Sequence, residues 1–153
     1  MMIHFSTPTS ADIDYISAHL CAEDVAELEA SGWSDPREAI EASIKDSDES
    51  FVASWHGKPQ CVFGVGPYPK DAALGVPWML STGRFGGVQR EFMQVSRKWI
   101  SDIEPGYGCL FNFVDARHIR AQRWLSALGF EPMKLHDFNN HQFIEFGRFP
   151  KCA

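Results

Sequence analysis

The sequence has no long apolar run, no excess of positive charge and no leader-like start. None of its apolar stretches approaches the roughly 20 residues that a membrane-spanning helix needs. Residues 1–5 lack the basic and then apolar order of a secretory signal. The chain carries 14 basic and 20 acidic residues and a net charge of -6, so as a whole it does not attract nucleic acid or anionic lipid. We therefore expect a cytoplasmic protein that binds neither a membrane nor nucleic acid.

Cysteine is sparse and unpatterned. The four cysteines form no C-x-x-C pair and no spacing typical of zinc sites: Cys21, Cys61, Cys109 and Cys152. Cys61 and Cys109 fall in apolar segments, which predicts buried and unreactive thiols. His136 and His141 flank a turn without companion ligands, so we interpret them as hairpin residues and predict no metal site.

The chain does contain enough apolar material for one full core. With 153 residues and a hydrophobic share of 44%, it fits a single domain spanning 1–153. Apolar spacing and turn residues predict an alternating series of strands and helices. Strands are expected at 3–5, 51–55, 60–65, 76–81, 109–114, 132–136 and 143–146. Helices are expected after Thr9, around 25–28, after Asp35, at 88–103 and between Ala116 and Gly129. A loop is expected from Pro67.

The stretch 107–130 is the most informative part of the chain. A short aromatic and branched run at 109–114 predicts a buried strand. An amphipathic helix follows, with Ile119, Trp124 and Leu125 on its apolar side and a basic cluster on the other. Gly129 stands where the helix should end, because glycine enters the left-handed region at little cost. The stretch is therefore a strand, a helix and the start of another strand.

This stretch resembles the last motif of the GNAT acyltransferases, V-x-x-x-N-x-x-A-x-x-x-Y-x-x-x-G-F. The corresponding positions, of which four agree, are Val114, His118, Ala121, Leu125, Gly129 and Phe130. His118 replaces the asparagine, and Leu125 replaces the tyrosine that commonly protonates the leaving thiolate. The order of the expected elements is also similar to that of the family over nearly the whole chain. The resemblance implies an α+β, GNAT-like (acyl-CoA N-acyltransferase) fold with a mixed central sheet flanked by helices.

The resemblance also implies a coenzyme A site where the helix at 88–103 begins. The family holds the diphosphate in a loop Arg/Gln-x-x-Gly-x-Gly/Ala, and here 84–89 supplies the arginine and one glycine, with Gln89 in the last position. Backbone N–H groups and the helix dipole favour an anion at such a place. The residues expected to bind acetyl-CoA are Leu80, Thr82, Arg84, Gly86, Gly87 and Val88. The alternative is that the glycines only turn the chain.

Two polar residues before the last helix are candidates for the chemistry. Acyl transfer from a thioester to an amine needs a deprotonated amine and a proton for the departing thiolate. His118, with an ordinary pKa of about 6.5, can supply that proton, and Asp115 can act as a base or orient the amine. The alternatives are that His118 is a surface residue and that Asp115 caps the helix. Asn112, inside the apolar strand, needs hydrogen-bond partners if it is buried.

A narrower similarity covers the second half of the chain. Pro77-Trp78, Ser96-Arg97-Lys98 and the residues from Asn112 to Gly129 look similar to a bacteriophage family of GNAT-like proteins that includes internal virion protein A. That resemblance implies the host cytoplasm, other phage proteins as partners and a role in virion assembly. Two functions therefore stand: acetyl-CoA-dependent N-acyl transfer to an amine of unknown identity, and a non-catalytic phage protein that acts through contacts. Gln89 and Leu125 should impair the first and not the second.

Overall fold

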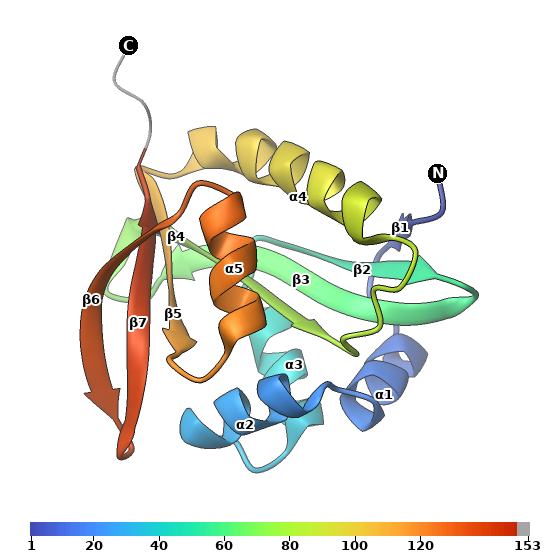
Figure 1. The fold of residues 1–153 in the computed structure, drawn as a ribbon, viewed down its shortest axis with the longest axis horizontal. Helices are drawn as coiled ribbons and strands as arrows, with labels where there is room; N and C mark the ends of the chain where they lie inside the picture. The colour runs from blue at the N-terminus through green and yellow to red at the C-terminus, as the bar shows by residue number, and fades with distance from the viewer. Residues whose placement is uncertain (150–153) are drawn as a thin grey trace.

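The computed structural model describes residues 1–149 as one sheet with helices on both sides (Figure 1). The strands are β1 (His4–Ser6), β2 (Glu49–Trp55), β3 (Lys58–Tyr68), β4 (Asp71–Ser81), β5 (Cys109–Asp115), β6 (Glu131–Phe138) and β7 (His141–Arg148). The helices are α1 (Ser10–Ala18), α2 (Ala22–Ala30), α3 (Pro36–Lys45), α4 (Gln89–Ile103) and α5 (Ile119–Ala127), and a short 3-10 turn η1 (Glu104–Gly106) follows α4.

The sheet is mixed, and its strand order is β1-β2-β3-β4-β5-β7-β6. Neighbouring strands are antiparallel except β4 and β5, which run parallel. Helices α1 to α3 lie on one face of the sheet, and α4 and α5 lie on the other (Figure 1). This is the α+β arrangement predicted from the sequence. Within residues 1–149, no helix combines the length and the apolar character that crossing a membrane requires.

The helix ends follow the local signals. Thr9 accepts the Asp12 N–H at 3.2 Å and its own N–H donates to the Asp12 carboxylate at 3.0 Å, which is the reciprocal cap expected for α1. Asp35 caps α3, and Pro36 is the first residue of that helix. Gly129, with φ of 88°, follows α5 in the left-handed region. These three predictions are confirmed, because each depends on residues within one turn of the helix end.

The loop expected from Pro67 is wrong. β3 continues to Tyr68 and β4 already begins at Asp71, so the segment forms a hairpin. The ladder passes through the Pro67–Gly75 pair, and a register shift between Pro67 and Tyr68 accommodates the proline. Proline and glycine lower the strand propensity of this segment. It is nevertheless a strand, because the neighbouring strand provides backbone hydrogen bonds that cannot be predicted from the local sequence.

Strands β4 and β5 separate soon after they meet. Their parallel pairing is confined to Leu74 with Cys109 and Gly75 with Leu110. Pro77 follows and has no N–H to offer β5. Its carbonyl oxygen instead accepts from the Asn112 side chain, with 2.7 Å between Nδ2 and O, so Asn112 has the partner that its position requires. The two strands therefore form an open V in the middle of the sheet.

The apolar side of α5 reaches the core except at its first residue. Leu125 is buried between α4, α5 and the sheet, whereas Ile119 is 50% exposed because it is the first residue of α5 and lies beyond the core. Cys61 is fully buried as expected, and Cys109 is only half-buried. The remaining cysteine, Cys152, lies outside the described residues.

Candidate active site

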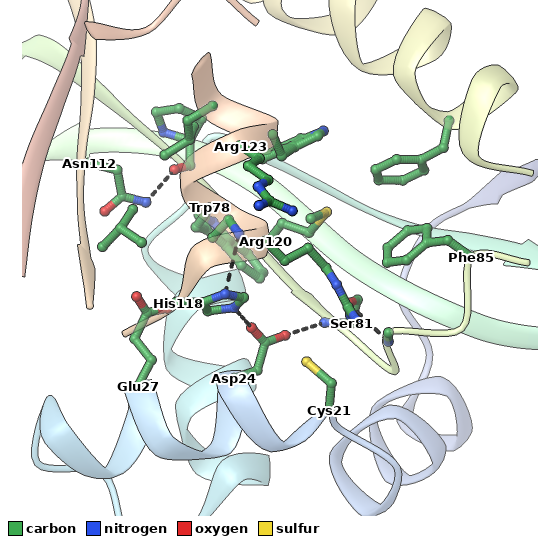
Figure 2. Close-up of a pocket in the computed structure, with 18 of the residues that line it drawn as sticks. Cys21, Asp24, Glu27, Trp78, Ser81, Phe85, Asn112, His118, Arg120 and Arg123 are labelled. Carbon is green, nitrogen blue, oxygen red and sulfur yellow. Dashed lines mark hydrogen bonds and ion pairs between the residues drawn. The ribbon is translucent and has the colours of Figure 1, made fainter. Parts of the chain in front are cut away.

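The V between β4 and β5 opens into a cavity of about 470 Å³ (Figure 2). Its lining comes from β4, β5, α5, the start of α4 and the helix α2 on the opposite face of the sheet. Two parts of this lining are charged. Asp24 and Glu27 on α2 form what we term the acidic wall. Arg120 and Arg123 on α5, with Gly83 and Gly86 of the loop before α4, form the basic wall.

On the basic wall, Arg120 lies directly against the loop that precedes α4. A Cβ atom added to Gly83 would come within 2.6 Å of Arg120 Nη1, so the guanidinium lies directly against the backbone of this loop. Gly83 also has φ of 76°, which favours glycine independently. Arg120 and Arg123 have no carboxylate partner among the ion pairs of residues 1–149. Two positive charges are thus left available to the cavity.

The start of α4 adds hydrogen-bond donors beside these arginines. Its N-cap residue Val88 makes no side-chain capping bond, as is also true of Cys21 at the start of α2, whereas α1, α3 and α5 each have one. Cβ atoms added to Gly86 or Gly87 would meet nothing within 4 Å, so the space beside the loop is open. Gln89, the first residue of α4, also lines the cavity. An uncapped helix start with open space in front of it can accept an anion.

The loop residues predicted to bind the cofactor do not all face the cavity. Gly86 lines it, whereas Gly87 and Val88 precede α4 without being part of the lining. The N–H of Val88 is already bonded to the Phe85 carbonyl oxygen at 3.0 Å. The Arg84 side chain is exposed and lies outside the lining. The cations that line the cavity are therefore the two arginines of α5.

The backbone groups of Leu80, in β4, and of Thr82, just after it, face the neighbouring strand β3. The Thr82 N–H donates to the Gln60 carbonyl oxygen at 2.9 Å, and its hydroxyl donates to Gln60 Oε1 at 2.6 Å. Leu80 is buried in the core that α1 and α3 form with the sheet. Backbone groups alternate in direction along a strand, so those of Ser81 and Met79 point away from β3.

On that side of β4, the groups of Ser81 are occupied and those of Met79 face the V. The Ser81 carbonyl oxygen accepts the Cys21 N–H at 3.0 Å, and the Ser81 N–H donates to Asp24 Oδ2 at 2.8 Å. Met79 lines the cavity, and β5 has already diverged from β4 at this level. The backbone of Met79 is thus the part of β4 that is positioned to pair with an extended ligand.

On the acidic wall, Asp24 joins three elements. Its Oδ1 accepts from His118 Nε2 at 2.7 Å and its Oδ2 accepts the Ser81 N–H, so α2, β4 and the start of α5 meet at one carboxylate (Figure 2). His118 Nδ1 accepts the Ala121 N–H at 3.2 Å and so caps α5. Because Nδ1 is an acceptor, the ring proton is on Nε2. Both nitrogens of His118 are therefore engaged, and the ring is buried rather than on the surface.

The environment of His118 shifts its pKa in two directions. Burial lowers the pKa of the ring, but hydrogen bonding and charge from Asp24, followed by Glu27, outweigh burial and leave the pKa raised. Beside it, burial and the negative charge of Asp24 raise the pKa of the Cys21 thiol to about 12. Cys21 is therefore a protonated thiol at neutral pH and not a nucleophile.

The ligand atoms of Cys21, Asp24 and His118 lie within 4.8 Å of one another, which resembles a metal site. The protonation of His118 does not fit that interpretation. A histidine that binds a metal through Nε2 carries its proton on Nδ1 and donates it to an acceptor. Here Nδ1 faces the N–H of Ala121, which is a donor. The cluster is therefore better described as a hydrogen-bonded junction.

Glu27 lines the cavity and has a pKa near neutral pH. Its Oε1 accepts the Asp115 N–H at 2.6 Å, which fixes the carboxylate at the end of β5. Burial raises the pKa of Glu27 to about 7, opposed by this hydrogen bond and by His118. A cavity carboxylate with such a pKa has the properties of a general base near neutral pH.

Asp115 and Leu125 do not present reactive groups to the cavity. Asp115 accepts from the Arg117 N–H at 2.9 Å and from its guanidinium at 2.7 Å, and these bonds hold the pKa of Asp115 below its ordinary value. The alternative considered for Asp115, that it caps the helix, is wrong: His118 is the N-cap of α5, and Asp115 holds the turn before it. Leu125 lines the cavity with an apolar side chain where the family has its tyrosine.

No local pattern in the sequence indicates the acidic wall. Asp24 and Glu27 lie on α2, whose sequence AEDVAELEA is typical of a solvated helix. Their partners His118 and Asp115 are 94 and 88 residues away. Arg120 and Arg123 belonged to a recognised basic cluster, but their direction was not evident. Their three-residue spacing, which places both side chains on the same side of α5, was the available sign that they act together.

Comparison with known proteins identifies the fold. No protein-family model and no curated protein matches the sequence. The aminoglycoside acetyltransferase AAC(6')-Ib, solved with ribostamycin and coenzyme A, has a TM-score of 0.71 at 11% identity, covering 97% of this chain and 94% of its own. The ribosomal-protein-S18-alanine N-acetyltransferase from Escherichia coli has a TM-score of 0.66 at 13% identity, covering 99% and 96%.

A third match is an N-acetyltransferase from Staphylococcus aureus Mu50, with a TM-score of 0.67 at 14% identity, covering 96% of this chain and 98% of its own. The chain therefore has the GNAT acetyltransferase fold, as the stretch 107–130 suggested. At these identities the similarity concerns the fold. The comparisons give no support to the narrower resemblance to phage internal virion proteins.

Proposed function

We propose that this protein is an N-acyltransferase that transfers the acyl group of acetyl-CoA to an amine. The observation that carries the proposal is one cavity that joins an open V in the sheet, an uncapped helix start beside two arginines, and a carboxylate with a pKa of about 7. A solved structure of the same fold contains coenzyme A, which supports the choice of donor. The cytoplasm remains the expected compartment.

The basic wall suits the diphosphate of coenzyme A. The N–H groups at the start of α4 and the guanidinium groups of Arg120 and Arg123 offer directed donors and positive charge to phosphate oxygens. The Met79 backbone suits the amide groups of the pantetheine arm. We therefore retain Gly86 from the predicted set and add Met79, Arg120 and Arg123. Leu80, Thr82, Arg84, Gly87 and Val88 are assigned to supporting the strand and loop.

Glu27 is the proposed general base. When bound, acetyl-CoA supplies a thioester whose carbonyl carbon accepts the amine. Glu27 removes a proton from the ammonium form of the acceptor, because its pKa of about 7 matches that task near neutral pH. The Met79 N–H is available to the carbonyl oxygen as negative charge develops there. Leu125 has no proton to give, so protonation of the departing thiolate falls to solvent.

His118 and Asp115 are proposed as positioning residues in place of the chemical roles considered from the sequence. His118 caps α5 through Nδ1 and fixes Asp24 through Nε2. Asp115 forms the turn between β5 and α5, and its N–H fixes Glu27. The acidic wall as a whole favours a cationic amine as the acceptor, since Asp24 and Glu27 both line its side of the cavity.

The test is calorimetric titration with acetyl-CoA, followed by an assay of thiol release with a panel of amines. We expect saturable binding that Gly86→Glu abolishes, because a carboxylate would enter the space intended for the diphosphate. Gly106→Glu is the matched control, since an added Cβ there also meets nothing within 4 Å and the residue lies outside the cavity.

Absence of binding at millimolar acetyl-CoA would overturn the enzyme proposal. It would leave the alternative that this chain has lost catalysis and acts through protein contacts, for which the loss of the tyrosine at Leu125 is the one supporting observation. Binding that survives Gly86→Glu would instead mean that the diphosphate does not lie on this loop.

A further inference from the structure

A second cavity, of about 410 Å³, lies on the side of the sheet that carries α4. Aromatic and aliphatic side chains dominate its lining, and they include Phe5, Phe51, Phe63, Val95, Trp99 and Trp124. Interiors are normally packed without spaces of this size. A large apolar cavity in a soluble domain is a characteristic of a binding site for an apolar group.

The polar side chains in this lining already have partners. Trp124 Nε1 donates to Ser96 Oγ at 3.3 Å, and Trp99 Nε1 donates to Glu49 Oε1 at 3.0 Å. At the rim, Lys98 and Asp102 pair with each other at 2.8 Å. Little hydrogen-bonding capacity is left for a polar ligand. The cavity therefore suits a group that consists of hydrocarbon alone.

The second cavity adjoins the candidate active site. Met79, Phe92 and Trp124 line both cavities, so a single layer of side chains separates them. Met79 is also the residue whose backbone faces the V. Methionine has three rotatable bonds and adapts easily to a ligand. A chain that extends from an acyl carbonyl beside Met79 would meet the second cavity directly behind this layer.

We infer that the second cavity receives the tail of a medium-length, straight-chain acyl group, and that the preferred donor is such an acyl-CoA rather than acetyl-CoA. This inference rests on the proposed function, because it takes the V as the place of the thioester. The carboxyl end of the acyl group lies in the V, and the remaining methylenes pass Met79 and Trp124 into the apolar space beneath α4.

The first test is titration of the wild-type protein with acetyl-, butanoyl-, hexanoyl-, octanoyl- and decanoyl-CoA. Each buried methylene should tighten binding by up to about 4-fold. We expect the dissociation constant to fall at least about 10-fold between acetyl- and octanoyl-CoA. If acetyl-CoA binds and octanoyl-CoA binds no more tightly, the inference is overturned and the proposed function stands. If no thioester binds, both fail.

The second test is Val95→Phe, which places a ring in the second cavity and not in the first. We expect it to remove the gain for octanoyl-CoA and to leave acetyl-CoA binding unchanged. Gln94→Phe is the control, because it adds the same ring at an exposed position of α4 that lines neither cavity. An equal gain for octanoyl-CoA in both variants would show that the tail binds elsewhere. Should Val95→Phe fail to fold, the wild-type series still decides.

Discussion

The acidic and basic walls line one cavity but differ in how their polar groups are satisfied. On the acidic wall, Asp24 and His118 bond to each other and to backbone N–H groups of Ser81 and Ala121. On the basic wall, Arg120 and Arg123 have no carboxylate partner within residues 1–149, and α4 begins without a side-chain cap. The polar groups of the acidic junction are therefore paired within the protein, whereas those of the basic wall are left to pair with a ligand.

This difference indicates where each substitution should act. Changes to the hydrogen-bonded junction of the acidic wall should alter folding stability, because they leave buried groups without partners. Changes to the basic wall should alter ligand binding, because no internal bond is lost there. Glu27 belongs to neither pattern, since it is held by one backbone bond and yet has a strongly raised pKa. The four predictions that follow test this division, in order of decreasing effect.

The largest expected effect is on catalysis by Glu27→Gln. The amide keeps the shape and can still accept the Asp115 N–H, but it cannot take a proton. We expect kcat to fall by about 10²–10⁴-fold while the affinity for acetyl-CoA stays unchanged. Steady-state assay of thiol release measures the first and calorimetry the second. Glu29→Gln, on the exposed side of the same helix, is the control and should have wild-type kcat; full activity in Glu27→Gln would exclude this base.

The next effect concerns the basic wall. Replacement of both Arg120 and Arg123 by alanine should weaken acetyl-CoA binding by about 10–100-fold and make it less dependent on salt, because two charged donors to the diphosphate are lost. Thermal unfolding should change little. Arg97→Ala on α4, also an exposed arginine but outside both cavities, is the comparison variant. Equal affinities for the double variant and for Arg97→Ala would contradict the assignment.

A smaller change, and one of a different kind, is expected for Asp24→Ala. Loss of the carboxylate leaves the Ser81 N–H and His118 Nε2 without an acceptor, which should lower the free energy of unfolding by about 2–3 kcal/mol. Asp24→Asn keeps one acceptor oxygen and should lose less. Urea denaturation measures both. If Glu23→Ala, at the neighbouring exposed position, lost as much stability, the junction would have no special role.

The smallest effect is the pH dependence caused by Glu27. Its pKa in the folded protein, about 7, lies above the ordinary 4.5, so the fold favours the protonated acid. Its contribution to stability is therefore greatest at low pH and is lost as the pH rises from about 4.5 to about 7. Relative to Glu27→Gln, the wild type should lose about 1–2 kcal/mol between pH 5.5 and 7.5. Parallel denaturation curves at both pH values provide the measurement; a constant difference would mean that the pKa is not raised.

The local features of the fold were predictable, and the site was predictable only in part. Thr9, Pro36 and Gly129 marked helix ends correctly because their effect is confined to one turn. Asn139 and Asn140, with φ of 48° and 62°, form the turn between β6 and β7 that was expected between His136 and His141. The hairpin at 67–71 was missed, because its backbone bonds come from the neighbouring strand and not from the local sequence.

The same contrast applies to the functional residues. The glycine loop before α4 was evident from its composition, and Gly86 of this loop lines the cavity. His118 was open to two interpretations, and the one that placed it on the surface is contradicted by its burial. No pattern within a short window can show that a histidine will meet an aspartate 94 residues earlier in the chain.

The sequence by itself determined the order of strands and helices, the helix ends marked by Thr9, Pro36 and Gly129, and the GNAT-like signature of 107–130, because caps, turns and periodicity act over a few residues. The tertiary structure decided which charged groups face the cavity and which are paired with other groups of the protein. A pKa depends on burial and on neighbouring charges, and for Glu27 these come from β5 and α5, which only the folded chain brings together. The open V, likewise, exists because β5 diverges from β4 after Gly75, a relation between strands that neither segment contains alone.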